Sequence, residues 1–536
     1  MDTKALRQKI LDLAIRGKLV PQDPNDEPAS VLLERIRAEK QQMVKDGKLK
    51  AKDIKNDTII FKGDDNLHYE QFADGTVKCI EDEIPFELPD GWAWERLGNV
   101  TTIARGGSPR PIKSYLTTEL DGVNWIKIGD TEKNGKYIFS TKEKIKPEGI
   151  AKSRYVKSGD FLLTNSMSFG RPYILKTDGC IHDGWLMIGN TEIVFNQDYL
   201  YYALSSDFMY NMLSVLAGGS TVDNLNSDLV KSLLFPIPPM QEQIIIANKA
   251  ESLMKIVDTI NNNEKELLKN IKSIKSKILD LAIRGKLVPQ DPNDEPASVL
   301  LERIREEKEE LIKQGKIKRD KKESVIFKGD DNSYYEKISD EITCIDDEIP
   351  FEIPNTWEWL RLENCCSKEI RRGKSPKYTD ASGTLVFAQK CNKKYAGIDI
   401  GLALYLDEST LSKYPADEYM QDGDVVINST GTGTLGRVGL YQIADNRSCI
   451  PIVPDSHVTV IRSFSNIQSF YLYAFLKANQ SNLEKKGEGS TNQKEIKPIT
   501  LKELLVPMPP IAEQKQISAT IMRIFSIINT IEKNLS

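Results

Sequence analysis

The chain has 536 residues, of which 40% are hydrophobic and 28% charged, and its formal net charge is −5. This composition is ordinary for a globular protein, and no run of eighteen apolar residues predicts a membrane span. The slightly acidic total argues against tight nonspecific DNA binding by the chain alone, although local basic loops are compatible with specific binding.

The N-terminus and the cysteines favour a cytoplasmic protein. The opening stretch MDTKALRQKILDLA lacks the apolar core and cleavage site of a signal peptide. The seven cysteines form no CxxC pair and are expected to be reduced thiols. The three histidines lie far apart, which disfavours a histidine-based metal site.

An internal repeat begins near the N-terminus. Residues 9–37 read KILDLAIRGKLVPQDPNDEPASVLLERIR, and residues 277–305 repeat this sequence without one change. The offset is 268 residues, half of the chain. The chain is therefore two copies of one unit, and its target is expected to be twofold or to have two parts.

The first copy opens with residues 1–46, which are predicted to form an N-terminal helical region. A shorter helix near 29–46 places Pro28 in its first turn. Residues 47–91 are predicted to be a hairpin or extended insert, in which the GDDN stretch forms the hairpin turn.

Residues 92–239 are predicted to form the first compact domain of mixed α and β structure. The run TEIVF at 191–195 indicates a strand, and the run from 199 to 216 indicates helix. Trp92 and Trp94 are assigned to core packing rather than to base stacking.

Three polar loops of this domain are candidates for contacting DNA: a basic Gly/Pro loop, a strand-end loop that closes with Gly-Arg, and a Gly-Ser-Thr stretch. Hydroxyls, amides and arginines on such loops suit phosphate and base-edge contacts. The alternatives are a solvated loop, a tight turn that closes a strand pair, and a helix cap. The candidate residues are Arg105, Ser108, Arg110, Asn165, Ser166, Ser168, Arg171, Ser220 and Thr221.

Residues 240–315 are predicted to form the central helices, and Gly285 ends the long one. The C-terminal residues 511–536 match the first half of this long helix, and the N-terminus matches its second half. The repeat is therefore circular and predicts two long antiparallel helices, one continuous and one split between the termini, related by a pseudo-twofold axis. The apolar residues that form a heptad seam are Leu253, Val257, Ile260, Leu267, Ile271, Ile274, Ile278 and Leu281.

The second copy repeats the motifs of the first, whereas the residues between these motifs differ. Residues 316–356 repeat the insert, and residues 357–510 form the second variable domain. Between the repeated motifs, residues 105–230 and 372–500 diverge almost completely. The matching candidates for DNA contact are Arg371, Arg372, Lys374, Ser375, Lys377, Asn428, Ser429, Thr430, Thr432, Arg437, Ser490, Thr491, Asn492 and Gln493.

The segment Gly431–Arg437 offers one alternative function. It has the glycine spacing of a phosphate loop, but an arginine replaces the lysine and Val438 replaces the metal-binding hydroxyl. A nucleotide-dependent enzyme that uses this loop is therefore one rival interpretation. A symmetric scaffold that binds only proteins is the other.

In this order and in circular register, the motifs resemble the specificity (S) subunits of type I restriction-modification systems. The markers are dEIPFeiPxgWxWxRL, a GGSP-type loop, GDxxxxNS, a GST stretch and PxPPxxEQ at the start of a long helix. The resemblance covers essentially the whole chain. It implies a mixed α/β fold with two globular target-recognition domains joined by two long antiparallel coiled-coil helices. Each domain would read one half of a bipartite DNA site, and the helices would set the spacer.

The resemblance also implies the partners. An S subunit carries no catalytic residue and no cofactor, and it docks two methyltransferase (M) subunits on double-stranded DNA. S-adenosylmethionine, ATP and Mg would belong to the M subunits and to restriction (R) subunits that can join them. The insert before each recognition domain is expected to pack against an M subunit or to brace the domain.

Overall fold

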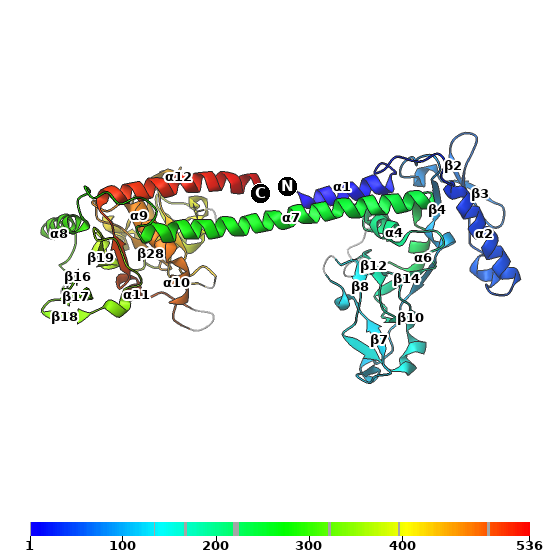
Figure 1. The fold of residues 1–536 in the computed structure, drawn as a ribbon, viewed down its shortest axis with the longest axis horizontal. Coiled ribbons are helices and arrows are strands. Elements are labelled where there is room, and N and C mark those ends of the chain that lie inside the picture. The colour runs from blue at the N-terminus through cyan, green and yellow to red at the C-terminus, as the bar shows by residue number, and fades with distance from the viewer. Residues whose placement is uncertain are drawn as a thin grey trace. The chain divides into compact units, whose positions relative to one another are not determined.

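The computed structural model describes residues 2–132, 135–165, 169–217, 225–319, 323–394, 397–431, 433–489 and 494–535. The chain folds as two compact units, Met1–Glu264 and Lys265–Ser536. Helix α7 (Met240–Ile283) begins in the first unit and ends in the second (Figure 1). No helix of the described residues is long and apolar enough to cross a membrane.

Helix α1 (Thr3–Ile15) lies antiparallel to the first half of α7 in the first unit. The Asp2 carboxylate caps its N-terminus by accepting from the backbone N–H groups of Lys4 and Ala5. Ile10 and Leu11 pack in one cluster with Val257 of α7. Burial of this apolar stripe orients α1, because a helix of 13 residues has little stability of its own.

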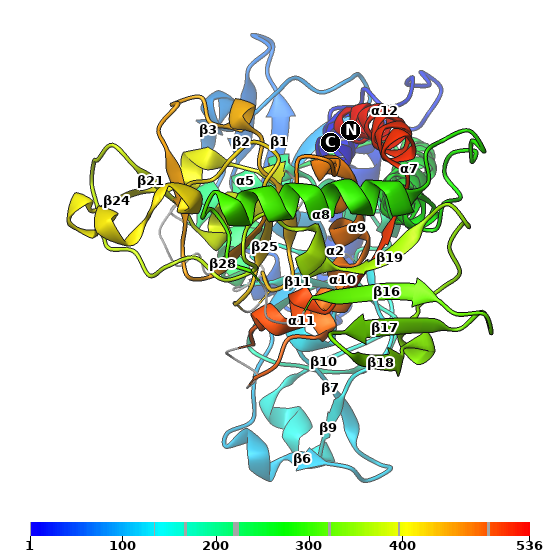
Figure 2. The same cartoon turned by 90° about the vertical axis from the view of Figure 1, so that its left-hand side faces the viewer.

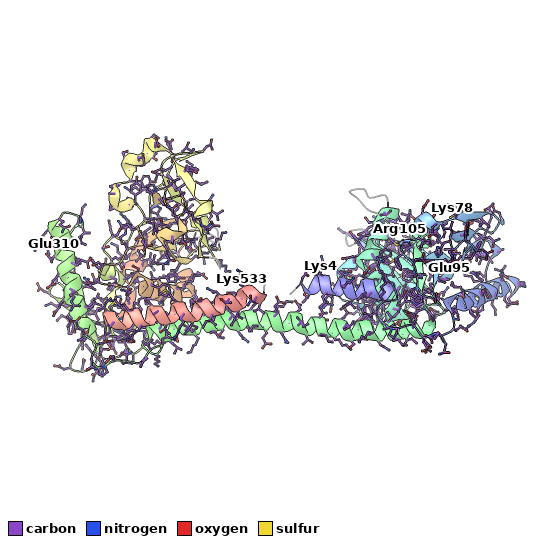
Figure 3. All side chains as sticks on the ribbon, turned by 90° about the horizontal axis from the view of Figure 1, so that it is seen from above. Lys4, Lys78, Glu95, Arg105, Glu310 and Lys533 are labelled. Carbon is purple, nitrogen blue, oxygen red and sulfur yellow. The ribbon has the colours of Figure 1, made fainter. Side chains whose placement is uncertain are left out.

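Helix α12 (Ile511–Leu535) packs in the same way on the second half of α7 in the second unit (Figure 3). Ile271 and Ile278 of α7 meet the buried Ile517, Ile521 and Ile528 of α12. Lys275 Nζ lies 2.7 Å from Glu532 Oε2 across the pair.

The heptad seam predicted for α7 is only partly correct. Val257, Ile271 and Ile278 are buried, whereas Leu267 and Ile274 are exposed. Since each residue turns an α-helix by about 100°, Ile274 lies roughly 60° to one side of Ile271. The contact stripe instead continues through Lys275 and Ala282.

Helices α2 (Ala29–Lys45) and α8 (Ala297–Lys313) confirm the shorter helices predicted in both copies. Pro28 was predicted to lie in the first turn, but it precedes α2 as the N-cap, and Pro296 precedes α8 in the same way. The first helical N–H is free to pair elsewhere: that of Ala29 donates to the Gly91 carbonyl oxygen over 2.8 Å.

Each insert forms a three-stranded antiparallel sheet, and the GDDN stretches are hairpin turns as predicted. Arg96 donates to the carboxylates of Glu70 and Glu83 and so fastens the first sheet to the next strand. Figure 2 shows the three strands of the second sheet, with β16 nearest to helix α8. The strands are β1 (Ile59–Lys62), β2 (His68–Gln71) and β3 (Val77–Cys79), then β16 (Ser324–Lys328), β17 (Tyr334–Ile338) and β18 (Glu341–Cys344).

Each recognition domain starts and ends on one two-stranded ribbon. Strand β4 (Ala93–Arg96) pairs with β15 (Leu234–Ile237), and β19 (Glu358–Arg361) pairs with β29 (Leu505–Met508). Trp92 and Trp94 are buried, which confirms their assignment to the core, and Trp357 and Trp359 of the second copy are buried as well.

The repeated PxPPxxEQ motif closes this frame. Glu242 accepts hydrogen bonds from Trp92 Nε1 over 2.8 Å and from Gln22 Nε2 over 3.1 Å. In the second unit Glu513 accepts from Trp357 Nε1 over 2.8 Å and from Gln290. The same side-chain clasp therefore ties the long helix to the recognition domain and to the GKLVPQ loop in both copies.

The first recognition domain contains two five-stranded sheets, ordered β10-β13-β7-β9-β6 and β5-β14-β11-β12-β8. The predicted strand at 191–195 is wrong, because this segment is a turn after β14. The α-helices described in this domain are α3 (Leu97–Val100), α4 (Gln197–Leu204), α5 (Asp207–Leu216) and α6 (Ser227–Lys231). The strands are β5 (Thr102–Arg105), β6 (Leu116–Thr117), β7 (Val123–Ile126), β8 (Tyr137–Ile138), β9 (Glu143–Ile145), β10 (Arg154–Val156), β11 (Phe161–Thr164), β12 (Pro172–Leu175), β13 (Gly179–Ile181) and β14 (Trp185–Gly189).

The second recognition domain has different sheets, ordered β20-β24-β21-β27, β26-β25-β28 and β22-β23. Its helices are α9 (Ser469–Ala478), α10 (Gln480–Lys485) and α11 (Pro498–Lys502). The strands are β20 (Tyr378–Thr379), β21 (Leu385–Phe387), β22 (Asn392–Lys393), β23 (Gly397–Ile398), β24 (Leu404–Leu406), β25 (Val425–Asn428), β26 (Val438–Leu440), β27 (Ile452–Pro454) and β28 (Val458–Ile461).

Candidate nucleic-acid interface

Asp183 gathers four of the candidate residues of the first domain. Its carboxylate accepts from Ser108 Oγ over 2.6 Å and lies 3.2 Å from Arg110 Nη2. Its carbonyl oxygen accepts from Arg105 Nε over 3.2 Å and from Asn165 Nδ2 over 2.8 Å. The basic loop and the end of strand β11 are therefore joined at one turn.

Sequence reasoning missed Asp183, although the signal was present as a His-Asp-Gly turn directly before a strand. The hydrogen bond from Ser108 holds the pKa of the Asp183 carboxyl below its usual range, and the Arg110 charge acts in the same direction. The carboxylate is therefore ionised at neutral pH. It orders the loop and leaves the Arg110 side chain 78% exposed.

Asn165 is buried rather than presented at the surface. Its backbone N–H donates to Gly184, and its carbonyl oxygen accepts from the N–H of Leu225. Its side-chain Oδ1 has no hydrogen-bond partner among the described protein atoms. These contacts indicate that Asn165 holds the loop in shape and does not contact a base directly.

Arg171 lines a cleft of about 830 Å³ within the first unit, bordered by α1, α4, α5 and the first half of α7. Its guanidinium lies 5.6 Å from the centre of the Tyr173 ring. The lining also includes Lys4, Lys136 and Tyr210. Cations interleaved with aromatic rings suit a nucleic-acid strand, because phosphates take the charges and bases take the rings.

In the second domain, the buried Glu418 carboxylate forms ion pairs with the basic side chains of the corresponding loop. Arg371 Nη2 donates to Glu418 Oε1, and Lys374 Nζ lies 3.6 Å from the same oxygen. Lys368 Nζ lies 3.2 Å from Oε2. A buried carboxylate needs such partners, so these cations are structural in this state.

The rest of this loop is arranged differently. Arg372 Nη1 donates to Glu495 Oε2 over 3.0 Å, and both side chains are partly exposed. Ser375 and Lys377 are exposed. These three residues are the better candidates for phosphate contact within this loop.

Asn428 and Ser429 are buried at the end of β25. Asn428 Nδ2 donates to the Gln389 carbonyl oxygen over 3.1 Å, and the Ser429 and Thr459 hydroxyls lie 2.7 Å apart. Thr430 Oγ1 lies 2.6 Å from His457 Nδ1 and is only partly buried. Thr430 is therefore the member of this trio that is open to a ligand.

Arg437 is held by its own domain. Its guanidinium donates to the carbonyl oxygens of Asn392 over 2.7 Å and of Gly433 over 3.1 Å. The loop before it joins β25 to β26 as an antiparallel hairpin. A phosphate loop requires a helix at this point, so the nucleotide-site alternative is wrong.

Nine candidate residues lie outside the described residues: Ser166, Ser168, Ser220, Thr221, Thr432, Ser490, Thr491, Asn492 and Gln493. The residues that follow the two Gly-Ser-Thr stretches are described. The N–H of Leu225 donates to the Asn165 carbonyl oxygen, and that of Ile496 donates to the Ser429 carbonyl oxygen. In both domains the segment after this stretch is thus fastened to the strand-end loop.

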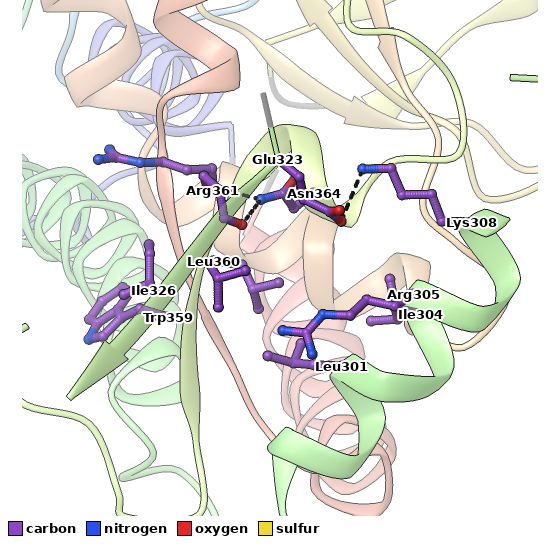
Figure 4. Close-up of a pocket in the computed structure, with 12 residues that line it drawn as sticks. Leu301, Ile304, Arg305, Lys308, Glu323, Ile326, Trp359, Leu360, Arg361 and Asn364 are labelled. Carbon is purple, nitrogen blue, oxygen red and sulfur yellow. Dashed lines mark hydrogen bonds and ion pairs between the residues drawn. The ribbon is translucent and has the colours of Figure 1, made fainter. Parts of the chain in front are cut away.

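The pocket in Figure 4 is a packing gap between α8, β16 and β19. Its volume is about 40 Å³, and Lys308, Glu323 and Asn364 border it. This holds a few water molecules, whereas small-molecule sites span roughly 300–1,000 Å³. Within the described part of the chain, no three His, Cys, Asp or Glu side chains group as a metal site.

Comparison with known proteins identifies the family to which this architecture belongs. The type I restriction modification DNA specificity domain matches residues 89–270 and 354–536. The specificity subunit of the Escherichia coli type I restriction enzyme EcoEI is 28% identical over 99% of this chain and 90% of its own length. That of EcoAI, also from E. coli, is 32% identical over 67% of this chain and 62% of its own length.

A solved structure described as the basis of complex assembly and conformational transition of the type I R-M system has the same fold. It superposes with a TM-score of 0.59 and 18% identity, covering 84% of this chain and 94% of that one. The chain therefore belongs to the family of type I restriction-modification specificity subunits. Such a subunit is a non-catalytic DNA-recognition component with two target-recognition domains.

Proposed function

We propose that each target-recognition domain of this chain reads one half of a bipartite DNA site. We take residues 92–239 and 357–510 as the two domains. One observation carries the proposal: the Trp–Glu–Gln clasp and the ribbon are the same in both units, whereas the sheets and polar loops between them differ. Different readers on one repeated frame fit two different half-sites.

We further propose that the repeated frame docks two identical methyltransferase subunits and that the long helices set the spacer between the half-sites. Restriction subunits join the same complex. S-adenosylmethionine, ATP and Mg²⁺ act in these partners. Because the target is chromosomal DNA, we place the complex in the cytoplasm.

The polar loops favour some contacts over others. The described residues that we propose for DNA contact are Arg105, Arg110, Arg171, Arg372, Ser375, Lys377 and Thr430. Four other candidates have side chains that hydrogen-bond within their own domain, so we assign them to holding the shape of the loops. They are Asn165, Asn428, Ser429 and Arg437.

The test is a footprint of the chain assembled with its methyltransferase subunit. Hydroxyl-radical cleavage of DNA from the host should show two short sequence-specific protected segments separated by a spacer of fixed length. A complex that assembles but protects no specific site would identify the chain as a protein-only scaffold. One continuous protected site read by a single domain would contradict the two-reader proposal.

A further inference from the structure

The two insert sheets expose the same apolar strip on the face that points away from their own unit. Strand alternation places Phe61, Tyr69 and Cys79 side by side on this face of the first sheet. Phe327, Tyr335 and Cys344 take the same places in the second. We call these two surfaces the outer faces of the insert sheets.

The outer faces are not needed to fasten the sheets. The opposite face does that: Arg96 binds Glu70 and Glu83, and Arg361 binds Glu336 and Glu348. Phe61 and Phe327 remain 40% and 38% exposed, and Val77 and Ile342 next to them are also exposed. Exposed apolar residues in a repeated pattern indicate a contact surface.

The two copies show which positions of the sheet have been kept. The outer-face Phe, Tyr and Cys are identical, and Val77 is replaced only by another aliphatic residue. Other exposed positions of the same sheets have drifted, for example Lys78, which corresponds to Thr343. Each phenylalanine stacks on the tyrosine opposite it, with ring centres 5.8 Å apart for Phe61 and Tyr69 and 5.9 Å apart for Phe327 and Tyr335, and this pair stabilises its hairpin. The stacking leaves Phe61 40% and Phe327 38% exposed, so the same apolar surface is presented to a partner in both units.

The charges around these faces describe that partner. The hairpin turns beside the strips carry exposed acidic residues: Asp64, Asp65 and Asp74 in the first sheet, and Asp330, Asp331 and Asp340 in the second. Acidic turns repel DNA phosphates, which argues against nucleic acid as the occupant. They suit a protein surface with an apolar centre and lysine or arginine at its edge.

We propose that the outer face of each insert sheet docks one methyltransferase subunit. This rests on the proposed function, in which two identical subunits bind the repeated frame. It gives the insert two roles: its inner face braces the recognition domain, and its outer face holds the enzyme that acts on the site which that domain reads.

The exposed cysteines allow a test on the unmodified chain. Cys79 and Cys344 lie on the outer faces, and Cys449 is exposed in the second recognition domain. Iodoacetamide labelling is followed by mass spectrometry, with and without purified methyltransferase subunit at about ten times its dissociation constant. Labelling of Cys79 and Cys344 should then slow about tenfold, while labelling of Cys449 stays unchanged.

Substitutions test the same surface by stoichiometry. Phe61→Asp should leave one docked methyltransferase subunit per chain, and Phe61→Asp with Phe327→Asp should leave none, because each substitution weakens docking about 30-fold or more. Phe72→Asp is the matched control. Phe72 belongs to the same insert and is 39% exposed, but it lies in the turn after β2 and not on the outer face. Light scattering of the complexes gives the counts.

The outcomes separate this inference from the proposed function. A wild-type complex that forms and protects its DNA while Cys79 and Cys344 label at the unbound rate would overturn the docking face alone. Protection that grows with the concentration of the chain by itself would assign the face to a second copy and also overturn it. If wild-type chain and methyltransferase subunit do not assemble at all, the proposed function fails first.

Discussion

At the scale of single residues, two loop arginines that the sequence marks as candidates for DNA contact have different surroundings. Arg110 extends from the basic loop with its side chain 78% exposed and forms an ion pair over 3.2 Å with Asp183. Arg437 donates two hydrogen bonds to backbone carbonyl oxygens of its own loop region. Loop arginines are equivalent in sequence, but the free energy of a bound phosphate comes mainly from those whose donors face solvent.

Arg110→Ala should therefore weaken DNA binding of the assembled complex and leave the fold unchanged. Loss of one phosphate contact reduces the slope of log K against log salt by about one. Arg437→Ala should instead lower the free energy of unfolding by about 1–2 kcal/mol, because two carbonyl oxygens lose their donor. Salt titrations of binding and urea unfolding of both variants check this. A stable Arg437→Ala chain with relaxed specificity at one half-site would reassign Arg437 to base reading.

Glu336 and Arg361 give a prediction for pH. Both are buried, and the hydrogen bond from Arg361 holds the pKa of the Glu336 carboxyl below its usual range. A depressed pKa adds stability above the pKa of the unfolded chain, about 4.3, and this stability is lost as the pH falls through the folded-state pKa. Removing one partner of a buried pair costs about 3 kcal/mol.

Glu336→Gln should consequently lower the free energy of unfolding by about 3 kcal/mol at pH 7, and the difference from wild type should shrink below about pH 4. Urea unfolding at both pH values measures it. The control is Glu341→Gln, an exposed carboxyl of the same sheet. A difference that is independent of pH would show that the loss comes from packing and not from the ionised carboxylate.

At the scale of elements, the helix pair of the second unit depends on a narrow stripe. Ile521 is fully buried between α12 and α7, whereas Ile527 on the same helix is 59% exposed. Ile521→Ala should cost about 2–4 kcal/mol, because it removes buried methylene groups and leaves a cavity. Ile527→Ala should change stability by less than about 0.5 kcal/mol. Thermal unfolding of both variants decides; equal losses would contradict the observed stripe.

The elements that could be predicted from sequence are those with local signals. Helical periodicity located α2, α8 and α12, and the GDDN turns located the insert hairpins. The strand at 191–195 was wrong because a short apolar run does not distinguish a strand from a buried turn. Leu267 and Ile274 were placed in the seam because sequence does not show which side of a heptad the neighbouring helix covers.

The candidate site could be predicted only as loops. The repeat identified the basic, strand-end and Gly-Ser-Thr loops, because shared motifs stand out between divergent domains. Which side chains remain accessible depends on acidic residues far away in sequence: Asp183 for the first basic loop, and Glu418 and Glu495 for the second. Such pairings are tertiary: the His-Asp-Gly sequence marks Asp183 as a turn residue, but no local pattern shows which loop its carboxylate binds.

At the scale of the whole molecule, α7 is the only covalent helical connection between the two described units. Seven residues inserted near Asn261–Asn263, with matching insertions in the terminal helices, keep the heptad phase and add roughly 10 Å. The spacer of the recognised site should lengthen by up to about three base pairs, while both half-sites stay the same. Methylome sequencing of a host that carries the variant measures the spacer. An active complex with an unchanged spacer would refute the role of the helices.

The central claim is that the two target-recognition domains recognise DNA independently of each other, although each is held by the same repeated ribbon and helices. The repeat allows a direct exchange, because the frame is the same where each domain begins and ends. Residues 372–500 can be replaced by a second copy of residues 105–230, so that both positions carry the first reader. Single-molecule sequencing of methylated adenines should then find the first half-site, a spacer and the same half-site inverted, in place of the asymmetric wild-type site. Continued methylation of the wild-type site, or of a site with only one half, would contradict the account.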